Sequence, residues 1–184
     1  MTRDQVLELV KQKITNVNLV KHCLAVEIVM KGLARYFKED EEKWGLAGLL
    51  HDIDYEQTKD DPQKHSLVGA EMLKNLDLSE DICQAVKVHN EAHGIKPETL
   101  MAKSLFVADP LTGLIIAATL VLPSKKIIDL TVENVLNRFK EKGFARSANR
   151  EIIKQCETIL NLPLANFVKI VLEAMQKINN ELGL

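Results

Sequence analysis

The chain has 184 residues, of which 46% are hydrophobic and 27% are charged. That length suits one well-buried domain, and the apolar content excludes an intrinsically disordered protein. The 24 basic and 26 acidic residues nearly cancel, so the chain has no overall basic footprint for nucleic-acid binding, and phosphate recognition is expected to be local.

Apolar residues recur at helical spacing along almost the whole chain. Leu19, Cys23, Val26, Met30 and Leu33 illustrate this, because their steps of three and four residues place them on one helix face. No segment combines period-two alternation with turn residues at both ends, so no strand is predicted. The predicted helices are, in chain order, 2–14, 17–37, 40–52, 62–76, 80–91, 97–121 with a break or kink at Pro110, 131–142, 147–160 and 163–181. We expect an all-α, single-domain helical bundle spanning 1–184.

Start signals support several of these helices. Thr2 with Gln5 predicts a capping box, and Asp61-Pro62 is typical of an N-cap followed by proline in the first turn. Ser147 is a further candidate cap. These signals place helix starts near residues 2, 62 and 147.

The sequence predicts a cytoplasmic protein without a membrane segment. Its start has no apolar signal-peptide core, and its most apolar stretch, Leu111–Leu122, is too short to span a bilayer. The three cysteines, Cys23, Cys83 and Cys156, are far apart in the sequence and are typical of buried thiols in a reducing compartment.

Histidines concentrate in the first half of the chain. Four of the five lie on the apolar stripes of four separate predicted helices: His22, His51, His65 and His89. One buried histidine is usually a core residue with a hydrogen-bond partner. Four that converge would need four partners, and a shared cation satisfies them together.

Two aspartates complete this set. Asp52 follows His51 directly after an apolar run, and Asp109 stands among apolar neighbours before Pro110. A carboxylate in such a place is costly to bury without a cation or several donors. Asp109 can alternatively cap a helix that restarts at Pro110. Because neighbours on a helix point about 100° apart, His51 and Asp52 can share an ion only near a helix end, which is expected here.

These residues resemble the HD superfamily of metal-dependent phosphohydrolases, which is defined by a His, a later His-Asp pair and a distant Asp. Here the matching residues are His22, His51-Asp52 and Asp109, and the segment Ala47–Asp54 is similar to the family's helix-ending segment. The resemblance covers roughly residues 18–115. Helices in 124–184 carry no matching motif and are expected to pack against this core.

Two further segments resemble the HDIG-like subgroup with additional histidines. They are His65-Ser66-Leu67-Val68-Gly69-Ala70 and Val86-Lys87-Val88-His89-Asn90. The resemblance implies that His65 and His89 bind a second metal and that Asp52 bridges the two. The chain departs from the subgroup at Asn90, where a second His often stands.

This ligand set implies a cofactor of one or two divalent ions, which are Mn, Fe, Co, Ni, Zn or Mg, because it contains no thiolate. The reaction implied is hydrolysis of a phosphomonoester or phosphodiester by a metal-activated water, with a nucleotide-like small molecule as substrate. No membrane or nucleic-acid partner is expected, and the pattern specifies no oligomeric state.

Secondary roles fall to nearby polar residues. Asp52 and Asp54 are candidate catalytic acids, and Asp54 is predicted to orient a ligand histidine, to accept a proton or to be a solvated acid at the helix end. Lys64 beside His65 is a further catalytic candidate. Arg146 and Arg150 are candidates for binding the substrate phosphate.

Two other functions fit the same residues. A di-iron HD-type oxygenase would use the same six-ligand set. A non-catalytic nucleotide-binding HD domain would use the scaffold alone, but such domains usually lose the His-Asp pair or the last Asp, which are present here.

Overall fold

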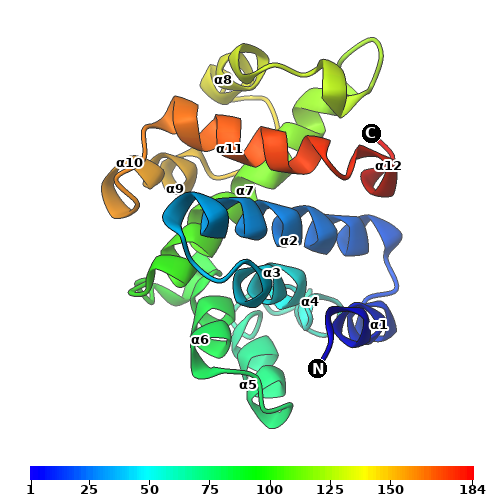
Figure 1. Cartoon of the computed structure of the whole chain (residues 1–184), viewed down its shortest axis with the longest axis vertical. Coiled ribbons are helices and arrows are strands. Elements are labelled where there is room, and N and C mark those ends of the chain that lie inside the picture. The colour runs from blue at the N-terminus through cyan, green and yellow to red at the C-terminus, as the bar shows by residue number, and fades with distance from the viewer.

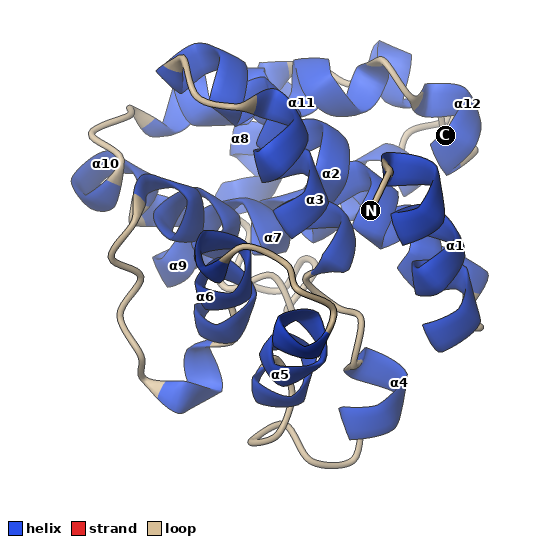
Figure 2. Ribbon diagram, turned by 60° about the horizontal axis from the view of Figure 1, so that its bottom comes forward, coloured by secondary structure: helices blue, strands red, loops and turns tan.

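The protein consists of helices joined by short loops (Figure 2). The structure is a computed structural model that describes residues 1–184, and it contains no strand. The all-α prediction is therefore confirmed. The first half contains α1 (Arg3–Lys13), α2 (Val17–Phe37), α3 (Glu41–Leu50), α4 (Tyr55–Thr58), α5 (Leu67–Asn75), α6 (Glu80–Val88) and the 3₁₀ turn η1 (Glu91–His93). The second half contains α7 (Leu100–Leu120), η2 (Ile127–Asp129), α8 (Val132–Lys140), α9 (Arg150–Lys154), α10 (Cys156–Ile159), α11 (Leu164–Gln176) and α12 (Asn179–Leu182).

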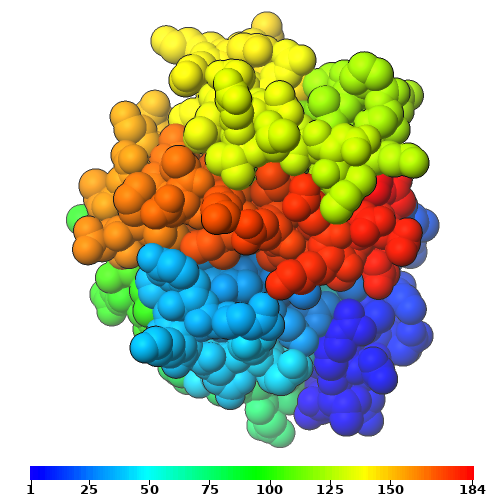
Figure 3. All heavy atoms as spheres, turned by 45° about the horizontal axis from the view of Figure 1, so that its top comes forward, coloured from blue at the N-terminus to red at the C-terminus, as the bar shows by residue number.

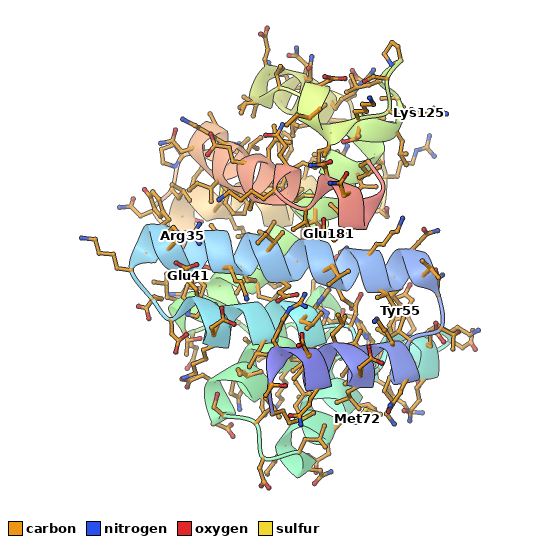
Figure 4. All side chains as sticks on the ribbon, turned by 45° about the vertical axis from the view of Figure 1, so that its right-hand side comes forward. Arg35, Glu41, Tyr55, Met72, Lys125 and Glu181 are labelled. Carbon is orange, nitrogen blue, oxygen red and sulfur yellow. The ribbon has the colours of Figure 1, made fainter.

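Helices α2 and α3 form a tight antiparallel hairpin. The chain leaves α2 at Lys38, which adopts left-handed backbone angles, and Asp40 then caps α3 through the amides of Glu42 and Lys43. Arg35 and Glu41 form an ion pair across this turn, and Figure 4 shows their side chains close together. The hairpin brings the C-terminal end of α3 beside the N-terminal part of α2.

Gly48 permits the close approach of these two helices. A Cβ atom at Gly48 would lie 2.6 Å from the carbonyl oxygen of Val26 in α2. Backbone cannot move aside as a flexible side chain can, so any larger residue would push α3 away from α2. Glycine at this position therefore sets the distance between His51, one turn later, and α2.

Helix α7 runs through the centre of the molecule and joins its two halves. In Figure 1 it passes behind α2, from α6 to the layer of α8 and α11. It is long and apolar enough to cross a membrane by composition, but 61% of its most apolar window is buried inside the fold. Its apolar character therefore matches its position in the core.

The C-terminal helices cover the face of α2 opposite α3. Figure 1 shows α11 lying along α2, with α8 above it, and Figure 3 shows the red and yellow atoms of these segments stacked above the blue N-terminal helices. Gly32 of α2 and Ala174 of α11 touch at this contact, since a Cβ at Gly32 would lie 3.2 Å from that of Ala174. One hydrophobic core of 47 buried residues runs through both halves.

Four of the predicted helices differ from the structure. Helix α5 begins at Leu67 rather than at 62, so Asp61-Pro62 is a turn and not a helix start. Helix α7 continues through Pro110 without a break, so Asp109 does not cap a restarting helix. The segment 147–160 contains two short helices, the first capped by Asn149 rather than Ser147, and 163–181 is divided after Gln176.

Candidate metal centre

Four of the predicted ligands meet where α2, the end of α3 and the middle of α7 converge. The Nε2 atom of His22 lies 3.1 Å from Nε2 of His51 and 2.9 Å from Oδ1 of Asp109. The Oδ2 atom of Asp52 lies 3.5 Å from Nε2 of His51 and 3.7 Å from Nε2 of His22. Ligands about 2.1 Å from one ion and at right angles to each other lie about 3 Å apart, which these separations approach.

A second group lies on the other side of Asp52. Nε2 of His65 is 3.2 Å from Nε2 of His89, and the two nitrogens lie 3.3 and 3.5 Å from Oδ1 of Asp52. His65 comes from the loop before α5 and His89 from the end of α6. The two oxygens of the Asp52 carboxylate therefore face two different pairs of histidines.

Every histidine of the cluster has a partner for its Nδ1 atom. The Nδ1–H groups of His51 and His89 donate to carbonyl oxygens one turn earlier, at Gly48 (2.8 Å) and Val86 (2.7 Å). The remaining two partners are side chains: Nδ1 of His65 donates to Oδ1 of Asp54 at 3.0 Å, and Nδ1 of His22 lies 3.3 Å from the Thr112 hydroxyl. Partners of this kind fix the tautomer and turn Nε2 toward a metal.

The donor set fits a divalent cation. With Nδ1 protonated, the Nε2 atoms of His22 and His51 carry lone pairs that face each other at 3.1 Å. Two lone pairs in that position repel unless a cation or a proton lies between them. The groups His22–His51–Asp109 and His51–Asp52–His89 each have ligand atoms close enough to hold one ion. No thiolate is among them, so the site favours ions that accept imidazole and carboxylate ligands.

The pKa shifts of the cluster also show that its carboxylates favour positive charge beside them. Burial is the largest influence on His51 and lowers its pKa, but the carboxylates of Asp52 and Asp109 outweigh it and raise the pKa to about 9. For His65, burial also lowers the pKa, and hydrogen bonds to Asp52 and Asp54 raise it to about 9. Burial raises the pKa of Asp52, yet His51, His65 and His89 together hold it well below its usual range.

Asp54 is part of the support for His65 rather than a solvated acid. It is fully buried, and its Oδ2 atom accepts hydrogen bonds from the amides of Ser66 and Gly69, both at 2.8 Å. The solvated-acid prediction for Asp54 was wrong, because the chain folds back over the end of α3. Asp54 is buried, does not line the cavity at the cluster and is bonded to His65, so it acts through His65.

A small cavity opens on the cluster. It has a volume of about 170 Å³, and it is lined by His65, His89, Asn90, Glu91, Phe106, Asp109, Pro110, Ser147, Asn149 and Ile152. The Asp109 side chain is the most exposed of the six predicted ligands, at 27%, whereas that of His51 is fully buried. Access to the cluster is therefore from the side of α7 and the loop before α9.

The structure does not bring all predicted catalytic and binding residues together. Lys64 is 69% exposed and pairs with Asp61 at 3.1 Å, so nothing connects it with the cluster. Arg150 donates to the carbonyls of Ala145 and Ala148 at 2.5 and 2.7 Å, which makes it a support of its own loop rather than a free phosphate ligand. Arg146 is exposed, beside Ser147 at the cavity rim.

Three supporting residues were missed by the sequence analysis. Thr112 lies one turn after Asp109, where its hydroxyl donates to the Asp109 carbonyl at 2.8 Å and meets His22. The other two are the Gly48 contact with α2 and the Gly69 amide bonded to Asp54. Two signals in the sequence point to them: Thr112 and Gly48 each lie one turn from a ligand, and Gly48 and Gly69 stand in segments that resemble the family.

Comparison with known proteins agrees with this geometry. The HD domain family model matches residues 19–114, just over half of the chain, and the match includes the whole cluster. The chain belongs to the HD domain family. HD domains form a superfamily of metal-dependent phosphohydrolases that bind divalent metals. The C-terminal helices α8–α12 lie outside the residues that match the HD family model.

Curated relatives of this HD domain include ribonucleases. It is 32% identical to Ribonuclease Y of Lawsonia intracellularis over 138 residues. This alignment covers 73% of this chain and 26% of that protein. It is 30% identical to Ribonuclease Y of Desulforudis audaxviator over 173 residues. That alignment covers 90% of this chain and 32% of that protein. The chain thus spans about a quarter to a third of these relatives. No solved structure matches it significantly.

Proposed function

We propose that this HD domain hydrolyses a phosphate ester of a nucleotide-like molecule at a centre for two divalent ions. The observation that carries the proposal is the Asp52 carboxylate, whose two oxygens face separate histidine pairs. His22, His51, Asp52 and Asp109 would hold one ion. His65, His89 and Asp52 would hold the other.

Bound divalent ions supply Lewis acidity toward a phosphoryl oxygen and lower the pKa of water. The protein side chains provide position and charge. Asp54 and Thr112 hold the rings of His65 and His22 in place. Ser147 is exposed and lines the cavity, so its hydroxyl is available to a phosphoryl oxygen.

A ribonuclease is the second candidate, and the names of the relatives favour it. Hydrolysis of a phosphodiester in RNA needs the same metal chemistry as hydrolysis of a small ester. The two candidates differ in substrate size, and therefore in what must bind outside the cavity.

The test begins with elemental analysis of the purified protein, followed by hydrolysis assays with Mn, Fe, Co, Ni, Mg and Zn. Substrates should include p-nitrophenyl phosphate, its bis-ester, mononucleotides and a short RNA, with oxygen uptake by the iron-loaded protein as a separate measurement. Asp52→Asn should lose metal and turnover. Asp60→Asn, an exposed acid of the nearby loop, is the matched control and should retain both. Metal retention and full activity in Asp52→Asn would show the assignment to be wrong.

A further inference from the structure

A second cavity adjoins the first and extends it over the C-terminal half of the protein. Its volume is about 550 Å³, and Glu91, Ser147 and Asn149 line both cavities. The rest of its wall comes from the end of α8, the loop 141–149 and α9. We call it the basic groove, after the cationic residues Lys140, Lys142, Arg146 and Lys154 that line it.

The cavity at the cluster is small, so a substrate must also occupy the space next to it. Small-molecule sites typically have volumes of about 300–1,000 Å³, and the cavity at the cluster has only about 170 Å³. It can hold a phosphoryl group and part of its ester, but not a whole nucleotide. The remainder of a substrate must therefore extend outward, and the basic groove is the continuous space beyond Ser147 and Asn149.

The charge of the groove is opposite to that of the whole protein. Five basic side chains line it, against the acids Glu91 and Glu151, whereas the chain has a formal net charge of −2. None of the four residues that define the groove forms an ion pair, and all four are exposed. Glu91 accepts a hydrogen bond from Asn149 at 2.7 Å. Such a concentration of unpaired cations attracts an anionic ligand.

The loop 141–149 is held in its conformation before any ligand binds. The Arg150 guanidinium donates to the carbonyls of Phe144, Ala145 and Ala148, and Ala145 adopts left-handed backbone angles with φ +41°. Arg146 and Ser147 follow immediately within this fixed loop. A preformed loop loses little conformational freedom when it binds a ligand, which favours affinity.

From these observations we propose that the basic groove is a subsite for a second phosphate, so that the preferred substrate carries at least one phosphate besides the scissile one. This inference rests on the proposed function, because it takes the scissile group to lie at the metal centre. The second phosphate can belong to a dinucleoside polyphosphate or to the next phosphodiester of a short oligonucleotide. Apart from Glu91, the residues that line the groove lie outside residues 19–114, in the C-terminal part of the chain.

Binding is measured first, without turnover. The probe is a 3′-fluorescein-labelled, 5′-phosphorylated pentauridylate, bound to the Asp52→Asn protein and followed by fluorescence anisotropy. Adding Lys142→Ala and Arg146→Ala should weaken binding about tenfold or more and reduce the slope of log affinity against log salt by about 0.7 for each lost phosphate contact. Adding Lys126→Ala instead should leave both unchanged, because Lys126 is exposed and does not line the groove.

Specificity is measured next, as kcat/KM for uridine monophosphate, 5′-phosphorylated diuridylate and diadenosine tetraphosphate. The natural chain should prefer at least one substrate with additional phosphates. The Lys142→Ala, Arg146→Ala variant should reduce that preference about tenfold, and the substrate whose preference falls identifies the source of the second phosphate. Thermal unfolding checks that both variants are folded.

Failure of the proposed function and failure of the phosphate subsite give different results. If no substrate is hydrolysed with any metal, the proposed function is wrong, and the anisotropy still decides the role of the groove. If hydrolysis depends on Asp52 but the groove variant binds and discriminates like the natural chain, the subsite is wrong and the metal centre stands.

Discussion

The two halves of this protein contribute differently to its proposed chemistry. The segment from α2 to α7 contains all five histidines and all six predicted ligands, and each ligand side chain is fixed by hydrogen bonds or burial. Helices α8–α12 contain no histidine, yet their loops shape the cavity and supply its nearest free cations. Under the two proposals above, the reacting centre and the selection of substrate are built by separate parts of the chain. Mutations in the two halves should therefore have different signatures.

The largest expected effect is on the first half, at Asp109. Asp109→Asn keeps the shape of the side chain but removes a charged ligand 2.9 Å from Nε2 of His22. We expect hydrolysis to fall by a factor on the order of 10³ and metal content to fall with it. Asp129→Asn, an exposed acid in η2, is the control and should change neither. Equal losses in both variants would contradict the division between the halves. Metal content and steady-state kinetics provide the measurement.

The next effect concerns the contact that positions His51. Gly48→Ala places a Cβ 2.6 Å from the Val26 carbonyl oxygen, so we expect a loss of about 1–3 kcal/mol in the free energy of unfolding and weaker metal binding. Gly113→Ala is the matched control, because a Cβ there meets nothing within 4 Å and the position is an exposed helix interior. That variant should gain up to about 1 kcal/mol from helix propensity. Denaturant titration measures both, and a stable Gly48→Ala protein would refute the role of this contact.

A smaller effect is expected at Asp54, which touches His65 but faces no substrate. Asp54→Asn keeps the size of the side chain and weakens the acceptor for Nδ1 of His65. Loss of such a supporting partner typically lowers metal affinity about 10–100-fold. We expect the affinity for one of the two ions to fall and the affinity for the other to be retained. Calorimetric titration with Mn²⁺ can resolve the two. Loss of both ions together would instead indicate a general unfolding of the site.

The last expected effect is a pH dependence of the stability of the metal-free protein. The pKa values of His51 and His65 are raised from 6.5 to about 9, so their protonated forms stabilise the folded state fully below pH 6.5. This stabilisation is lost as the pH rises through about 9. In chelator, Tm should therefore fall between pH 6.5 and 9.5, and saturating metal should abolish the fall. A Tm that does not change with pH in chelator would contradict the raised pKa values.

The sequence predicted the ligands better than it predicted their support. Helical periodicity indicates which residues of one helix point inward, so it placed His22, His51 and His89 correctly toward the core. It does not indicate how loops fold back, and the burial of Asp54 depends on the amides of Ser66 and Gly69, 12 and 15 residues later. The hydrogen bonds of Arg150 are likewise a property of one loop conformation. The break predicted at Pro110 was wrong, because proline disfavours a helix interior locally, whereas packing along all of α7 stabilises the helix.

The position of α7 has a consequence for where this protein can be divided. The family match ends at residue 114, but α7 continues to Leu120, and the helix packs against α8, α9 and α11, all of which lie outside the matched residues. Truncation after residue 114 would remove Ile115 and Ala118 from the core and leave apolar surfaces of α2 and α7 in water. A fragment limited to the matched residues should therefore aggregate, and the candidate metal centre must be transplanted together with the C-terminal helices.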